Sequence, residues 1–108
     1  MNFINQHKKE ISNICQQHHV KELFAFGSVV DSNKFNKESD VDLIVKFSEN
    51  IPVESYADLY FDLADQLEVL FDRKVDLMIK KVITNKFLNE NIEETKKLIY
   101  EAHNWVNN

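Results

Sequence analysis

The stretch Ser39-Asp40-Val41-Asp42-Leu43-Ile44-Val45 places two acidic residues, two positions apart, at the start of an apolar run. The run is rich in β-branched residues and predicts a strand over 41–47. Because side chains two apart on a strand point to the same face, Asp40 and Asp42 are expected to face one way. Two neighbouring carboxylates are costly without a cation between them, and oxygen ligands favour magnesium or manganese over zinc. Asp-x-Asp can equally cap a strand end in solvent, so the pair needs support from the rest of the chain.

Apolar periodicity predicts the other elements of the fold. In chain order they are a helix over 3–18, a strand over 23–26, a loop over 29–39, a helix over 54–71, a strand over 75–79 and a helix over 83–105. Three short strands with helices that cover one face of their sheet make an α/β (α+β) two-layer domain. At 108 residues the chain has room for one such domain, over 1–108, with a single core.

Asp76 stands inside the otherwise apolar strand 75–79, where a lone carboxylate is rare without a partner. It could instead lie at the solvated end of an edge strand. If its strand lies beside 41–47, its carboxylate converges with those of Asp40 and Asp42. Three converging carboxylates can hold two metal ions, the arrangement used for in-line displacement at phosphorus.

The chain's only glycine, Gly27, precedes Ser28 at the end of the strand over 23–26. A glycine there allows a sharp turn and lets a phosphate approach the main-chain amides, while the serine hydroxyl can donate to a phosphate oxygen. By itself a Gly-Ser step is an ordinary turn. What makes it a candidate phosphate site is the order: strand, Gly-Ser, a loop of eleven residues, then Asp-x-Asp on the next strand.

The composition excludes several classes of protein. Lys plus Arg number 13 against 18 Asp plus Glu, and the resulting net charge of −5 argues against direct binding to duplex nucleic acid. A single cysteine, Cys15, excludes an internal disulfide and a cysteine-based zinc site, and it is expected to be a buried core thiol. No apolar run reaches the roughly 18 residues that span a bilayer, so we expect a soluble cytoplasmic protein with no membrane partner.

Three motifs in this order resemble the minimal nucleotidyltransferase (MNT) domains of the DNA polymerase β-like superfamily. They are Phe26-Gly27-Ser28, Ser39-Asp40-Val41-Asp42-Leu43-Ile44-Val45 and Lys74-Val75-Asp76-Leu77. The resemblance covers nearly the whole chain and implies the nucleotidyltransferase fold, with a small three-stranded mixed sheet. It implies that Asp40, Asp42 and Asp76 are catalytic and bind Mg2+, with two ions expected and Mn2+ as a substitute. Gly27 and Ser28 are implied to hold the triphosphate of ATP or another NTP.

Small bacterial MNT proteins are often paired with a HEPN-type toxin, for which they serve as antitoxin and can adenylylate a tyrosine. The resemblance therefore implies transfer of AMP from ATP to an acceptor hydroxyl on such a partner. The chain has Asp31-Ser32 where many family members carry an arginine-glycine pair, and its loop is one residue longer. The alternative is therefore a catalytically weak or inactive binding module that masks a partner's site. Both interpretations are compatible with a homo-oligomer.

The remaining candidate residues favour structural roles. His18 and His19 project about 100° apart on a helix, so one ion cannot readily take both, and a role at the helix end is expected. Trp105 either folds back on the sheet or anchors a partner. Five lysines could form a basic edge beside the acids or solvate the helix faces. They are Lys80, Lys81, Lys86, Lys96 and Lys97.

Overall fold

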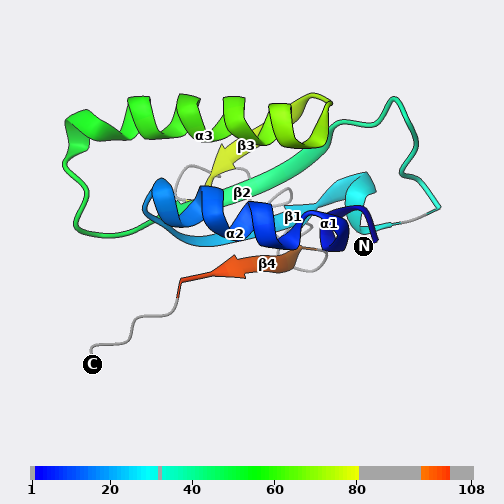
Figure 1. The fold of residues 1–108 in the computed structure, drawn as a ribbon, viewed down its shortest axis with the longest axis horizontal. Helices are drawn as coiled ribbons and strands as arrows, with labels where there is room; N and C mark the ends of the chain where they lie inside the picture. Colours follow the sequence, from blue (N-terminus) through cyan, green and yellow to red (C-terminus); the bar gives the residue numbers. More distant parts are fainter. Residues whose placement is uncertain (1, 32, 81–95, 103–108) are drawn as a thin grey trace.

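The computed structural model describes residues 2–31, 33–80 and 96–102 (Figure 1). Its elements, in chain order, are α1 (Asn2–Gln6), α2 (Lys8–Gln17), β1 (Val20–Phe26), the 3-10 helix η1 (Gly27–Val30), β2 (Val41–Phe47), the 3-10 helix η2 (Val53–Ser55), α3 (Tyr56–Phe71), β3 (Val75–Ile79) and β4 (Lys97–Glu101). The strands predicted over 41–47 and 75–79 are confirmed as β2 and β3. Among the described helices, none is both long and apolar enough to cross a membrane.

The strands form one mixed sheet in the order β3-β2-β1-β4. β1 runs antiparallel to β2 and β4, whereas β2 and β3 are parallel. In the parallel pair Asp42 lies opposite Asp76, which confirms that the strand of Asp76 lies beside the strand of Asp42. Phe26, the last residue of β1, is the partner of Asp42 on the other side. The end of β1 therefore meets the starts of β2 and β3 at one end of the sheet.

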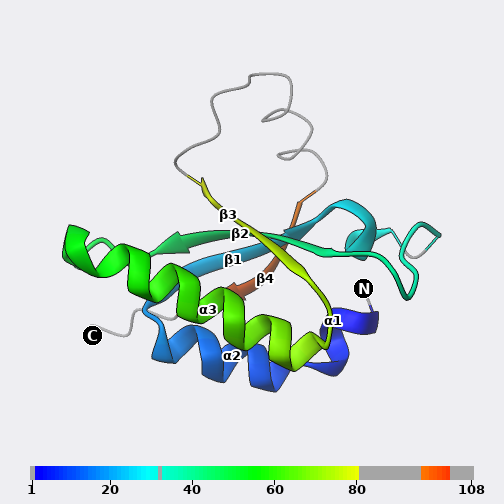
Figure 2. The same ribbon diagram turned by 90° about the horizontal axis from the view of Figure 1, so that it is seen from above.

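The helices α2 and α3 lie side by side on one face of the sheet (Figures 1 and 2). The main core fills the space between these helices and the sheet, where Leu43 and Leu63 are fully buried. We name the face turned away from α2 and α3 the distal face. A smaller apolar cluster centred on Phe24 and Ile44 lies there. The prediction that helices cover one face is confirmed for α2 and α3.

The predicted helix over 83–105 is wrong in its described part, because Lys97–Glu101 forms the strand β4. Residues 81–95 and Trp105 lie outside the described residues. β4 pairs with β1 and so covers main-chain groups that β1 would otherwise leave unpaired at an edge. A segment this short fits helical or strand periodicity, and the pairing with β1 decides its state. The described sheet therefore has four strands instead of the predicted three.

The predicted helix over 3–18 is divided at His7 into α1 and α2. His7 has φ −111° and ψ 14°, and its ring packs edge-on against the rings of Phe3 and Phe71. Phe3 of α1 also packs against Phe71, so α1 lies beside the last residue of α3 (Figure 2). The predicted apolar stripe is nevertheless buried, as Ile4 and Cys15 show.

Candidate active site

Gly27 directly follows β1 and opens the 3-10 helix η1. Its φ is +70°, in the left-handed region that residues with a side chain rarely adopt. A Cβ at this position would lie 2.5 Å from Oδ2 of Asp42, closer than real Cβ atoms come to another atom. Two separate features therefore require glycine at position 27: the left-handed turn of the backbone and the close approach of the Asp42 carboxylate. The main chain of the Gly27-Ser28 step thus lies against the acidic positions.

Asp42 and Asp76 occupy matched positions on the parallel strands β2 and β3. On each strand the residues before and after the acid are buried toward the helices, so both acids point to the distal face. Asp42 is half-buried and Asp76 is exposed. Asp40 precedes β2 by one residue and is also exposed. The structure therefore brings Asp42 and Asp76 together, with Asp40 at the entrance to β2.

Asp42 lies in an unfavourable environment for a negative charge. Its pKa is raised first by partial burial, then by the charge of Asp76 and then by the charge of Asp40. None of the ion pairs in the described part of the chain involves any of these three acids. Negative charge is therefore concentrated at this end of the distal face, and a divalent cation would relieve it.

The donor set suits a cation that arrives together with a phosphate ligand. Within residues 2–31, 33–80 and 96–102, no three His, Cys, Asp or Glu side chains are grouped so that they could hold a metal ion by themselves. Magnesium is usually held by one or two carboxylates together with substrate phosphates and water, not by an all-protein cage. Asp42 and Asp76 supply such a pair beside the Gly27 turn. The residues present thus fit a metal–nucleotide site that the nucleotide itself completes.

Side chains of α3 hold the two residues that flank Asp76. The Val75 N–H donates to Oε2 of Glu68 at 3.0 Å. The Tyr60 hydroxyl donates to the Leu77 carbonyl. β3 is the last strand in the described sheet order, so its outward main-chain groups need partners from elsewhere. These two bonds supply them and fix the backbone on both sides of Asp76.

The loop between η1 and β2 contains Asp31 and Ser32, the two residues that stand where many family members are expected to carry an arginine-glycine pair. Oδ1 of Asp31 accepts the N–H of Asn33 at 3.0 Å, so the carboxylate stabilises a turn in the loop. Ser32 lies outside the described residues. Asp31 therefore has a structural role in this loop.

Sequence analysis missed Arg73, which is the only arginine of the chain. Its Nη1 donates to the carbonyl oxygens of Asn36 at 2.9 Å and of Ser39 at 3.0 Å. Both acceptors belong to the loop that leads to Asp40. The available signal was one arginine in a chain that otherwise uses lysine, placed three positions before Asp76.

The histidine and cysteine residues set aside in the sequence lie in the helical layer. His18 is buried, with Nδ1 2.7 Å from the Ile14 carbonyl and Nε2 2.6 Å from the Asp62 carboxylate. These contacts join the end of α2 to α3, which confirms a structural role at the helix end. Cys15 is fully buried, and burial raises the pKa of its thiol to about 12, as expected for a core residue.

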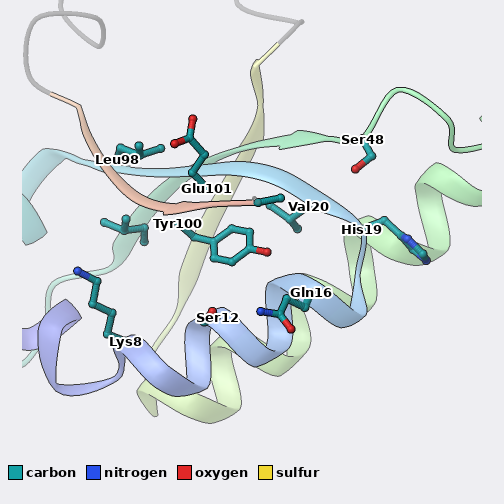
Figure 3. Close-up of a pocket in the computed structure, with 11 residues that line it drawn as sticks. Lys8, Ser12, Gln16, His19, Val20, Ser48, Leu98, Tyr100 and Glu101 are labelled. Carbon is teal, nitrogen blue, oxygen red and sulfur yellow. The ribbon is translucent and has the colours of Figure 1, made fainter. Parts of the chain in front are cut away.

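A cavity of about 770 Å³ lies between α2 and β4, away from these acids (Figure 3). Lys8, Ser12 and Gln16 of α2 face Tyr100 of β4 across it. None of the predicted site residues lines it. The candidate active site is therefore the end of the sheet around Gly27 and Asp42, outside this cavity.

Comparison with known proteins identifies the family of this chain. The family model described as "Polymerase beta, Nucleotidyltransferase" matches residues 9–104. A protein of Methanocaldococcus jannaschii named "Putative protein adenylyltransferase MJ1379" is 36% identical over 97 residues, which cover 90% of this chain and 89% of the relative. The match therefore extends over nearly the full length of both chains.

Two solved structures share the fold at low sequence identity. A chain of a toxin–antitoxin crystal structure with AMP-PNP has a TM-score of 0.66 at 17% identity, over 89% of this chain and 74% of that chain. A chain of the complex between a tri-AMPylated Shewanella oneidensis HEPN toxin and an MNT antitoxin has a TM-score of 0.62 at 16% identity. The match covers 92% of this chain and 73% of that chain. Since the family model covers most of its length and a curated relative matches from end to end, the chain belongs to the polymerase beta nucleotidyltransferase family.

Proposed function

We propose that this chain is a magnesium-dependent nucleotidyltransferase that moves AMP from ATP to an acceptor hydroxyl on a partner protein. The observation that carries the proposal is the meeting of two features at one end of the sheet. The Gly27 turn lies against the Asp42 carboxylate, and Asp42 lies opposite Asp76. Membership of the family supports nucleotidyl transfer as the reaction class. The name of the archaeal relative and the AMP-PNP in a similar structure support ATP over another NTP.

Each site residue has a defined role in this proposal. Asp40, Asp42 and Asp76 bind two Mg2+ ions, for which Mn2+ can substitute. When bound, the ions neutralise phosphate charge and lower the pKa of the acceptor hydroxyl. The main-chain amides of the Gly27-Ser28 turn and the Ser28 hydroxyl bind the triphosphate.

The proposed transfer is a single displacement at the α-phosphorus of ATP. The acceptor oxygen forms a bond to this phosphorus, and the bond from the phosphorus to the oxygen that bridges to the β-phosphate breaks. Pyrophosphate leaves with that electron pair, and the proton of the acceptor passes to the carboxylate of Asp76. Asp76 is exposed, so a hydroxyl on the surface of another protein can reach it.

The proposed partner is a HEPN-type toxin, for which this chain acts as a cytoplasmic antitoxin. Two similar structures are toxin–antitoxin complexes, and the toxin in one of them is tri-AMPylated. The site itself supports a macromolecular acceptor, because its acids lie on an exposed end of the sheet and not in the cavity between α2 and β4. A small-molecule acceptor would gain little from so open a site.

A second candidate function is a binding module that neutralises the partner by masking its site without any transfer. Two observations favour it. The carboxylate of Asp31 is engaged in a turn, and the family resemblance implies an arginine at this position in many members. Within the described residues, the acids do not form a complete metal site by themselves.

Neutralisation of a co-expressed HEPN-type toxin in growing cells separates the two functions. The site variant carries Asp40→Asn with Asp42→Asn, which preserves side-chain size. The control carries Asp58→Asn with Asp65→Asn, two exposed positions of α3, and removes the same formal charge. Enzymatic neutralisation predicts that the site variant fails to restore growth while the control succeeds. Restored growth with a soluble, folded site variant refutes the enzymatic proposal and supports masking.

A further inference from the structure

We infer that Arg73 is a positioning residue that holds Asp40 in the orientation needed to bind metal, an inference that rests on the proposed role of Asp40. Arg73 lies between α3 and β3 and reaches across to the loop over 33–39. A single nitrogen, Nη1, donates to the Asn36 carbonyl at 2.9 Å and to the Ser39 carbonyl at 3.0 Å. The second acceptor belongs to the residue that immediately precedes Asp40.

The guanidinium also lies against two aromatic rings that contact each other. Its central carbon lies 4.7 Å from the ring centroid of Phe3 and 4.5 Å from that of Phe35. Phe3 belongs to α1 and Phe35 to the loop, so Arg73 joins three separate segments. Its Nε is buried and has no hydrogen-bond partner in the described structure, which is costly for a polar atom. The contacts with the two rings offset part of this cost.

Arg73 supplies the tertiary hydrogen bonds of this loop. The other hydrogen bonds of residues 33–39 that the described structure contains join residues within 31–39. The Ser39 carbonyl and the Asp40 N–H belong to one planar peptide unit, so holding the carbonyl fixes the direction in which the chain enters Asp40. On the other side, the Val41 N–H donates to the Lys74 carbonyl at 2.9 Å. Asp40 therefore stands between two peptide units that the segment 73–74 holds.

Lysine cannot reproduce this arrangement. Its ammonium group can donate to a carbonyl, but it has no planar guanidinium that can donate to the loop and contact two aromatic rings at the same time. Residues that orient a metal ligand typically change metal affinity or activity by about 10–100-fold when they are replaced. We therefore expect Arg73 to act on metal affinity through Asp40 and not through direct contact with the nucleotide.

Mn2+ binding provides a readout that does not depend on transfer. Free Mn2+ is followed by electron paramagnetic resonance in the presence of AMP-PNP, for the wild type, Arg73→Met, Arg73→Lys and the control Lys9→Met. Lys9 is exposed on α2, so its replacement removes one charge away from the site. Circular dichroism at the same temperature measures the folded fraction. If Arg73→Met does not fold, Arg73→Lys carries the test.

The expected result is Mn2+ affinity about 10–100-fold weaker in both Arg73 variants and unchanged in Lys9→Met, at equal folded fraction. Folded Arg73 variants that bind Mn2+ as tightly as the wild type would overturn the inference, even if they melt at a lower temperature. Failure of the proposed function has a different signature. In that case the wild type itself neither binds Mn2+ with AMP-PNP nor transfers AMP, and the inference falls with it.

Discussion

Replacing Gly27 with alanine tests the contact on which the candidate site depends. At φ +70° an alanine is strained, by about 1–2 kcal/mol. The added Cβ would also lie 2.5 Å from Oδ2 of Asp42 but 3.4 Å from Cγ. Rotation of the carboxylate can therefore relieve the clash, and the rotation moves Asp42 away from its observed position. Each kcal/mol lost lowers the melting temperature by about 4–8 °C in a domain of this size.

A double-mutant cycle separates the two effects of Gly27→Ala. Urea unfolding followed by circular dichroism gives the free energy of unfolding for Gly27→Ala, Asp42→Ala and the double variant. We expect the glycine replacement to cost less when Asp42 is alanine, with the backbone part of about 1–2 kcal/mol remaining. We also expect AMP transfer to fall about a hundredfold in Gly27→Ala alone, because small displacements of reacting groups have effects of that size. Zero coupling between the two sites would show that Asp42 does not oppose a side chain at position 27, and unchanged transfer would show that the contact does not matter for activity.

Three further predictions concern titratable groups. The pKa of Asp42 is raised in the folded protein, which means that its negative charge opposes folding. The free energy of unfolding is therefore expected to fall as the pH rises from 3.8, the ordinary pKa of an aspartate, through the raised pKa of Asp42 in the folded protein. Asp42→Asn should therefore raise the free energy of unfolding at neutral pH while abolishing transfer, and urea titrations that show no gain would contradict this. The hydrogen bond from His18 lowers the pKa of Asp62 in the folded protein. The contribution of Asp62 to the free energy of unfolding is therefore present above 3.8, the ordinary pKa of an aspartate, and is lost as the pH falls through the lowered pKa of the folded protein. Asp62→Asn should accordingly lose less stability than the wild type on acidification in thermal melts, and an equal loss would count against the pairing. Finally, burial raises the pKa of Cys15 to about 12, so we expect a disulfide reagent to modify this thiol in urea but not in the native protein. Rapid modification of the native protein would contradict the burial of Cys15 in the core.

The elements around the acids could be predicted because their local patterns agree with their environment. The strand over 41–47 is apolar and β-branched, and the structure buries it between two neighbours. The single glycine lies at a position where both φ and a neighbouring carboxylate exclude a side chain, so the sequence alone marks a constrained turn of the backbone. The pairing of Asp42 with Asp76 follows from a parallel crossover through one helix, the usual connection between adjacent parallel strands.

The parts that escaped prediction depend on contacts between distant segments. Lys97–Glu101 carries too few residues for periodicity to show whether it forms a helix or a strand, and its pairing with β1 decides. The break at His7 depends on ring packing against Phe71. Arg73 acts on Asn36 and on Ser39, more than thirty positions away, so no local motif reveals its role. Tertiary packing overrides local signals at each of these positions.

We propose that the acids at the end of the sheet support the transfer of AMP to a protein acceptor. The most direct measurement is the intact mass of a purified HEPN-type toxin after incubation with this chain, ATP and Mg2+. We expect the toxin to gain the mass of one or more AMP groups with the wild type and with the Asp58→Asn, Asp65→Asn control. We expect no gain with the Asp40→Asn, Asp42→Asn variant. A toxin that stays unmodified by the wild type, under conditions in which an active family member modifies its own partner, would contradict the claim. So would equal modification by the wild type and the Asp40→Asn, Asp42→Asn variant.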